Sequence, residues 1–378
     1  MKIELKPDFH EEFNCIADRC SFTCCQEWKI AVDKDTFRSW KETDYEGRKL
    51  NTYTVSQSGA RVISLNEGHQ CPFLSANQLC ELVTRHGDSI LSHTCATFPR
   101  QIHRYRERTE YALVSCCPEV VDLLNRQESF RLEGDCGEPA GEENIAGMKE
   151  IRQTLMKIIQ EPSFDINTEL MCMFEIMLGI LKNGRVTRKE LGMCEGRAYL
   201  QKLTDDISAM EFDENETFQE DNELFLDLVE NYRKEELYTR HLSDMVSLAE
   251  KLEEEYEKYK IPEQLKKFRT EFAQYERLFR NYLAAELFTN GLLPNSPLDS
   301  LAVMLQWISL QYVTIRHSIF LKWLRKGSGK LEYSDVRDSI VLISRITGYS
   351  QSDIYEYLDN SFQSRIWEWG YEALIVGR

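Results

Sequence analysis

Thiol side chains are concentrated near the N-terminus of the chain. Ten of the twelve cysteines precede residue 137: Cys15, Cys20, Cys24, Cys25, Cys71, Cys80, Cys95, Cys116, Cys117 and Cys136. Only Cys172 and Cys194 follow them. Cysteines at this density can form disulfides, bind zinc or hold an iron–sulfur cluster. The first third of the chain is therefore predicted to be organised by sulfur chemistry.

Disulfides are the least favoured of these three chemistries. They stabilise small secreted domains that bury too little apolar surface, whereas 378 residues suffice for a core. The first residues lack the apolar segment of a signal peptide, so we expect a cytoplasmic protein with reduced thiols. Reduced thiols are free to bind a metal.

The spacing of the cysteines is compatible with either a zinc site or an iron–sulfur cluster. Zinc sites normally use two short Cys-x2-4-Cys pairs; Cys20 and Cys24 could form one, and no second short pair follows. Iron–sulfur clusters accept thiolates from distant points in the chain. Successive side chains of an extended segment point to opposite sides, so we expect one of Cys24 and Cys25 to bind while the other packs.

More cysteines are candidate ligands than a four-ligand centre requires. The candidates are Cys20, Cys24, Cys25, Cys71, Cys80, Cys95 and Cys117. Pro118 and Glu119 are typical of a helix start, which places Cys117 at a helix N-terminus, where the pKa of a thiol falls. This favours Cys117 over Cys116 as a ligand. We expect the remaining four to pack or to lie at the surface: Cys15, Cys136, Cys172 and Cys194.

Periodicity predicts a mainly α fold, with a small Cys-rich α+β domain over residues 1–132 and an α-helical domain over residues 144–378. Short strands are expected at Trp28–Val32 and Arg61–Leu65, and a hairpin over residues 102–115. A polar turn should bring Cys71 and Cys80 together. In the second domain, we expect an acidic loop at Glu211–Asn222 and a long charged helical stretch over residues 223–260.

An acidic, glycine-containing linker is predicted at Glu133–Glu143. Its glycines, Gly134, Gly137 and Gly141, superficially match a dinucleotide-binding loop. The spacing differs from that motif, Pro139 interrupts it, and no βαβ pattern surrounds it. We therefore interpret the segment as a linker between the two domains.

The net charge of the chain restricts the kinds of molecule that it is expected to bind. A net charge of −17 argues against nucleic-acid binding and favours basic partners, including a lysine-bearing substrate. The sequence contains no run of eighteen apolar residues, so it predicts no membrane span. A basic set stands out in this acidic chain: Arg100, His103, Arg104, Arg106 and Arg108. It could offset the charge of thiolates or hold a cofactor carboxylate, with Arg100 and Arg104 as candidates, or form an exposed hairpin face.

Several short motifs occur together. They are Cys20-x3-Cys24-Cys25-x2-Trp28-x-Ile30, Cys71-Pro72-Phe73-Leu74, Leu79-Cys80, Leu91-Ser92-x-Thr94-Cys95-x2-Phe98-Pro99-Arg100, Ser115-x-Cys117-Pro118-Glu119, Asn281-Tyr282-Leu283 and Leu287-Phe288 ahead of Leu293-Pro294. In this combination the chain resembles the flagellin lysine-N-methylase family of bacteria. Its Cys-rich part is also similar to a broader group of zinc- or iron-chelating domains. The family usually has Ser-Cys-Pro-Glu where this chain has an additional Cys116.

The resemblance implies methylation of flagellin lysines from S-adenosylmethionine, in an enzyme with a 4Fe-4S cluster. The sequence lacks the Cys-x3-Cys-x2-Cys spacing of radical enzymes, which favours polar methyl transfer. The alternative is a non-catalytic zinc- or iron–sulfur-binding sensor or interaction protein. The sequence identifies no catalytic base and no oligomeric state.

Overall fold

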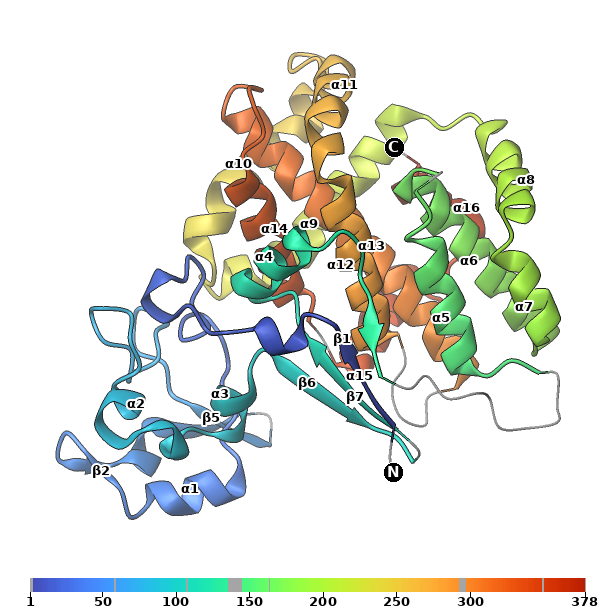
Figure 1. Ribbon diagram of the computed structural model, residues 1–378. Coiled ribbons are helices and arrows are strands. Elements are labelled where there is room, and N and C mark those ends of the chain that lie inside the picture. Colours follow the sequence, from blue (N-terminus) through green and yellow to red (C-terminus); the bar gives the residue numbers. More distant parts are fainter. Residues whose placement is uncertain are drawn as a thin grey trace.

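The computed structural model describes residues 3–57, 59–106, 108–134, 145–162, 164–291, 297–348 and 350–377. Helices dominate this part of the chain, which confirms the predicted mainly α fold (Figure 1). Nearly all of the predicted linker, including Cys136, lies outside the described residues. The domain boundary at the linker stays a prediction.

In the described ranges of the chain, eight short strands form three small sheets. Their bounds are β1 Ile3–Pro7, β2 Asp44–Tyr45, β3 Arg48–Lys49, β4 Thr54–Gln57, β5 Ala60–Ile63, β6 Arg100–Arg104, β7 Arg108–Leu113 and β8 Leu132–Glu133. The largest sheet has the order β6-β7-β1-β8, with β1 parallel to β7 and antiparallel to β8. The antiparallel pair β6 and β7 confirms the predicted hairpin.

Most residues between β1 and β6 form a small lobe with its own core, drawn in blue and teal in Figure 1. Trp40, Phe73 and Leu82 are buried at its centre. Its helices are α1 Lys34–Trp40, α2 Glu81–His86 and α3 His93–Thr97. Strand β5 confirms the prediction at Arg61–Leu65. The predicted strand at Trp28–Val32 is wrong, because this segment makes only a single bridge, from Ala31 to Val62.

The remaining helices form a larger body. Their bounds are α4 Pro118–Arg126, α5 Met148–Ile158, α6 Ile166–Asn183, α7 Arg188–Cys194, α8 Arg197–Ser208, α9 Glu214–Lys234, α10 Thr239–Glu255, α11 Ile261–Phe272, α12 Glu276–Asn290, α13 Leu298–Arg325, α14 Tyr333–Ile346, α15 Gln351–Phe362 and α16 Trp369–Val376. None of the helices described is long and apolar enough to cross a membrane.

The predicted acidic loop at Glu211–Asn222 is wrong, because α9 already begins at Glu214. The Asp213 carboxylate caps this helix by accepting a hydrogen bond from the backbone N–H of Asn215 at 2.8 Å. Acidic side chains in a first turn are favoured by the helix dipole. Phe218 is buried, so a core contact also holds the segment helical.

The long charged stretch is two helices instead of one. Helix α9 ends at Lys234 and α10 starts at Thr239. Between them Tyr238 has φ of 53°, a left-handed conformation that no α-helix accommodates. Tyr238 is itself buried, so packing holds the chain in this turn.

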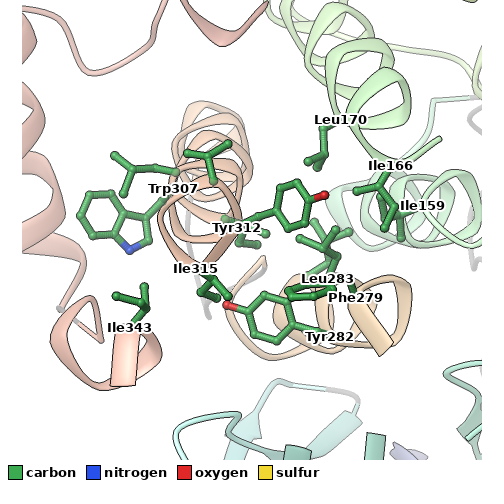
Figure 2. Close-up of a cluster of buried hydrophobic side chains, with 14 of the residues drawn as sticks. Ile159, Ile166, Leu170, Phe279, Tyr282, Leu283, Trp307, Tyr312, Ile315 and Ile343 are labelled. Carbon is green, nitrogen blue, oxygen red and sulfur yellow. The ribbon is translucent and has the colours of Figure 1, made fainter. Parts of the chain in front are cut away.

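Helices α12 and α13 form the centre of the body. Helix α13 is buried from Ser300 to Leu321, which fits a helix with apolar residues on all of its faces. Figure 2 shows Trp307 and Tyr312 of α13 projecting to different sides of this helix, with Tyr312 directed toward Leu170 of α6. This helix is the element around which the others pack.

The large sheet shares the core of the helical body. Leu5 of β1 and Leu113 of β7 belong to the same buried cluster as the helices. A buried ion pair adds to this contact, because the two terminal nitrogens of the Arg152 guanidinium donate to the carboxylate of Glu110 in β7, at 2.7 and 2.9 Å. Arg152 also donates to the carbonyl of Phe288 at 3.0 Å. The sheet is therefore fixed to α5 and α12.

The fully buried Glu372 of α16 predicts a pH-dependent stability. Burial raises the pKa of Glu372 from 4.5 to about 8, and the nearby Ser309 hydroxyl opposes this only in part. The folded state thus keeps the carboxyl neutral, whereas the unfolded chain ionises it above pH 4.5, so rising pH favours unfolding up to about pH 8. Glu372→Gln removes this effect.

We expect the stability gain of Glu372→Gln to grow by about 2–3 kcal/mol between pH 5 and pH 8 in urea unfolding. Exposed Glu368 of the same segment provides the control. Glu368→Gln makes the same chemical change at a position that is not buried. Equal pH profiles of Glu372→Gln and the parent chain would contradict the assignment.

Candidate metal centre

Eight cysteines line one cavity of about 480 Å³. They are Cys15, Cys20, Cys24, Cys25, Cys71, Cys80, Cys95 and Cys117. This volume lies in the range of ligand pockets, roughly 300–1,000 Å³. All seven cysteines predicted as ligands are in this set, together with Cys15. None of the cysteines that the structure describes forms a disulfide.

A short backbone pairing brings Cys25 and Cys71 together. Gln26 and Gln70 form an antiparallel bridge, and the backbone N–H of Cys71 donates to the carbonyl of Cys25 at 2.7 Å. Residues opposite each other in such a pair have neighbouring side chains. Two segments 46 positions apart in the sequence therefore present adjacent thiols to the cavity.

The predicted turn between Cys71 and Cys80 is confirmed. Leu74 and Cys80 form an antiparallel bridge, and the N–H of Glu81 donates to the carbonyl of Phe73 at 2.8 Å. Cys80 precedes α2, and Cys71 is buried in the small core. The polar turn thus folds these two cysteines onto one side of the cavity.

Cys95 and Cys117 lie at the starts of short helices. Ser92 caps α3 by accepting a hydrogen bond from the N–H of Cys95 at 3.2 Å. Cys117 is the N-cap of α4, with Pro118 in the first turn, as predicted. Cys95 packs against the small core and Cys117 against the large one.

The loop from Cys20 to Cys24 is held by the helical body. Arg345 of α14 donates to the carbonyls of Phe22 at 2.7 Å and of Thr23 at 3.0 Å. The Phe22 ring stacks on His241 with centroids 4.3 Å apart. The loop therefore bridges the two cores.

The expectation of a low pKa for Cys117 is wrong for the metal-free chain. Burial raises the pKa of Cys117 to about 12, although the backbone N–H groups of Glu119 and Val120 lower it. Burial likewise raises the pKa of Cys95 to about 11. Desolvation here outweighs the helix N-terminus, so these thiols are protonated at neutral pH until a cation displaces the protons.

Among the described side chains, no three His, Cys, Asp or Glu groups converge tightly enough to hold a single metal ion. The cysteines line one cavity, in which the thiol of Cys25 is a hydrogen-bonded neighbour of those of Cys24 and Cys71. A closed zinc site would need four donors about 2.3 Å from one atom. The described side chains do not show that geometry.

The basic residues of the hairpin occupy different environments. Arg100 lines the cavity, donates to the carbonyl of Phe13 at 3.2 Å and lies over the Phe13 ring. Arg104, four residues along the same strand, is exposed and outside the cavity lining. Arg108 pairs with Glu110 at 2.7 Å. Of the two predicted cofactor-binding arginines, only Arg100 therefore lies at the cavity.

The remaining basic residues do not face the cysteines. Arg106 is exposed at the tip of the hairpin. His103 is half-buried, and desolvation lowers its pKa while Glu110 raises it. These two residues belong to the hairpin face and to the Glu110 ion-pair cluster respectively.

Three other cysteines lie elsewhere. Cys172 is buried within α6, and Cys194 is half-buried beside Tyr199, as expected for packing residues. Cys116 is buried next to Cys117 but does not line the cavity. Cys15, predicted to pack or to lie at the surface, is exposed at the edge of the cavity.

Arg345 is the principal residue that the sequence analysis missed. It lines the cavity although 228 positions separate it from the last predicted ligand, Cys117. Its signal in the sequence is a single cation in the otherwise uncharged segment Ser339–Ile346. A charge on a buried helix face normally has a partner, which a single sequence does not identify.

Comparisons with known proteins give three results. The sequence pattern of the FliB lysine N-methylase C-terminal domain matches residues 152–375. Flagellar biosynthetic protein FliU of Salmonella muenchen is 30% identical over 139 residues, which are 34% of this chain and 80% of that protein. Lysine-N-methylases of Salmonella typhimurium and Salmonella choleraesuis are also 30% identical over 139 residues, and the match spans 34% of each. No solved structure matches.

The cavity predicts which cysteines retain metal. After anaerobic purification we expect Cys95→Ser to lose most of the metal and of any absorbance near 400 nm, because Cys95 lines the cavity. Cys194→Ser is the matched control, because Cys194 lies outside the cavity lining. Metal content is measured by elemental analysis. Full retention by Cys95→Ser, with loss in Cys194→Ser, would contradict the location of the site.

Proposed function

Because the chain belongs to the FliB lysine N-methylase family, we propose that it methylates lysine side chains of flagellin from S-adenosylmethionine. We further propose that the cysteine-lined cavity holds a 4Fe-4S cluster and that the protein acts in the cytoplasm. Family membership makes the chain an enzyme of the lysine N-methylase type. The particular substrate, methyl donor and cluster are inferences from the site.

The observation that carries the proposal is the position of the cysteine cavity against the matched methylase region. Arg345 lies within residues 152–375 and lines the cavity together with the N-terminal cysteines. Helix α4, which starts at Cys117, packs against α12 and α14 of that region. The cysteines and the methylase domain therefore contribute to a single site.

The cysteines that line the cavity come from distant points of the chain, which supports a cluster over a zinc ion. A cluster separates its thiolates by its own diameter, whereas zinc draws all donors to one atom. The described donors line a cavity and do not converge on one point. Four of the seven candidates, drawn from both sides of the cavity, would hold the cluster. The cluster would supply structural support. Alternatively, an iron that has no cysteine ligand would supply a site for the methionine part of the methyl donor.

Methyl transfer from a sulfonium needs a neutral amine aligned with the methyl carbon. A nitrogen–carbon bond forms, the carbon–sulfur bond breaks, S-adenosylhomocysteine leaves and the amine proton passes to water. Trp28 and Phe98 line the cavity with their rings 5.4 Å apart, and aromatic faces attract a sulfonium cation. Arg100 provides a guanidinium for the donor carboxylate.

The acidity of the chain supports a basic substrate. A net charge of −17 raises the encounter rate with lysine-rich surfaces at low ionic strength. It does not select one lysine, which requires contacts at the site.

Incubation with labelled S-adenosylmethionine and flagellin tests the function. We expect label on flagellin lysines, located by mass spectrometry, and none when the cysteine cavity has lost its metal through Cys95→Ser. A flagellin with all lysines replaced by arginine is the substrate control. Absence of label from a protein with an intact metal centre would instead favour a non-catalytic metal-binding sensor or interaction protein.

Variants of Arg100 and Arg104 test whether Arg100 binds the carboxylate of the methyl donor. We expect Arg100→Gln to raise the dissociation constant for S-adenosylmethionine about tenfold or more, because a charge-assisted hydrogen bond contributes about 1.5–3 kcal/mol. Arg104→Gln, an exposed change on the same strand, should leave it unchanged. Titration calorimetry measures both. Equal binding by the two variants would reject Arg100 as the carboxylate partner.

A further inference from the structure

Arg345 is a buried cation that donates three hydrogen bonds to the backbone of the Cys-rich region. Its side chain comes from α14, and the residue is 7% exposed. Nη2 donates to Phe22 and Nη1 to Thr23, and Nε donates to the carbonyl of Cys116 at 3.1 Å. These three carbonyls belong to residues within two positions of predicted ligands.

Arg345 makes no ion pair with any carboxylate in the described part of the chain. Arg337, two turns earlier on the same helix, shows the contrast, because it pairs with Asp122 and Asp338. A buried charge without a counter-charge carries a large desolvation cost. Carbonyl dipoles and the rings of Phe22 and Trp28, 4.6 and 5.0 Å away, offset only part of this cost.

Among the groups near Arg345 that are able to become anions are the cysteines of the cavity. Arg345 lines the same cavity as Cys20 and Cys24, which flank the two carbonyls that it binds in the loop. Metal binding would ionise several thiols and so create negative charge opposite this guanidinium.

We propose that Arg345 is the counter-ion and positioning residue of the thiolate-bound centre. It fixes the Cys20–Cys24 loop to the methylase domain and compensates the charge of the metal-bound thiolates. This inference rests on the proposed metal centre. It adds a residue of the C-terminal domain that touches neither the metal nor the reacting atoms.

Three variants separate the charge of Arg345 from its structural contacts. Arg345→Gln removes the positive charge. Arg345→Lys keeps the charge, but its single nitrogen cannot reproduce the three donors that the guanidinium directs at three carbonyls. Arg337→Gln is the control, because Arg337 also holds this loop, through a hydrogen bond to Ser21 at 2.9 Å, but does not line the cavity. Circular dichroism and thermal unfolding report whether each variant folds.

The measurements are metal content, the rate of metal release to a chelator and, for iron, the reduction potential. We expect Arg345→Gln to release metal roughly 10–100-fold faster, the usual effect of losing a residue that supports metal ligands. Its cluster should also have a more negative potential, because reduction adds negative charge that is no longer compensated. Arg345→Lys should keep a potential close to that of the parent chain, and Arg337→Gln should change neither quantity.

A purely structural role for Arg345 predicts a different pattern. Arg345→Gln and Arg345→Lys would then be equally impaired, or Arg337→Gln would match them, and either result would overturn the proposal. Unchanged release and potential in a folded Arg345→Gln would overturn it while leaving the metal centre intact. A parent chain without bound metal would overturn both this inference and the proposed centre.

Discussion

The site depends on the contact between two hydrophobic cores. Cys71, Cys25, Cys80 and Cys95 belong to or pack on the small core, whereas Cys117 and the Phe22 of the Cys20–Cys24 loop belong to the large one. Thiols from either core alone cover only part of the cavity. Packing of one core against the other is therefore what assembles a complete donor set.

Local sequence patterns were sufficient for the elements that carry the cysteines. The β6–β7 hairpin, the Cys71–Cys80 turn and the helix start at Pro118 all depend on residues within about a dozen positions of each other. Turn chemistry and capping act over such distances, so the sequence predicted these elements correctly. The convergence of the cysteines on one cavity could be expected only from their number.

Errors occurred where distant contacts decide the structure. The α9 segment was predicted as a loop from its acidic composition, but burial of Phe218 and the Asp213 cap keep it helical. The pKa of Cys117 was predicted from its position at the helix start, but burial between the cores has the larger effect. Arg345 was missed because its three carbonyl partners are remote in the sequence.

The hydrogen bond from Arg345 to Phe22 joins residues 323 positions apart, which has a consequence for biosynthesis. Translation proceeds from the N-terminus, and early segments can fold before later ones exist. The small lobe can therefore form while α14 has not yet been synthesised. Its loop has no anchor at that stage, and closing so long a segment of chain carries an entropic cost. Assembly of the complete cavity is consequently a late event, which follows synthesis of almost the entire polypeptide.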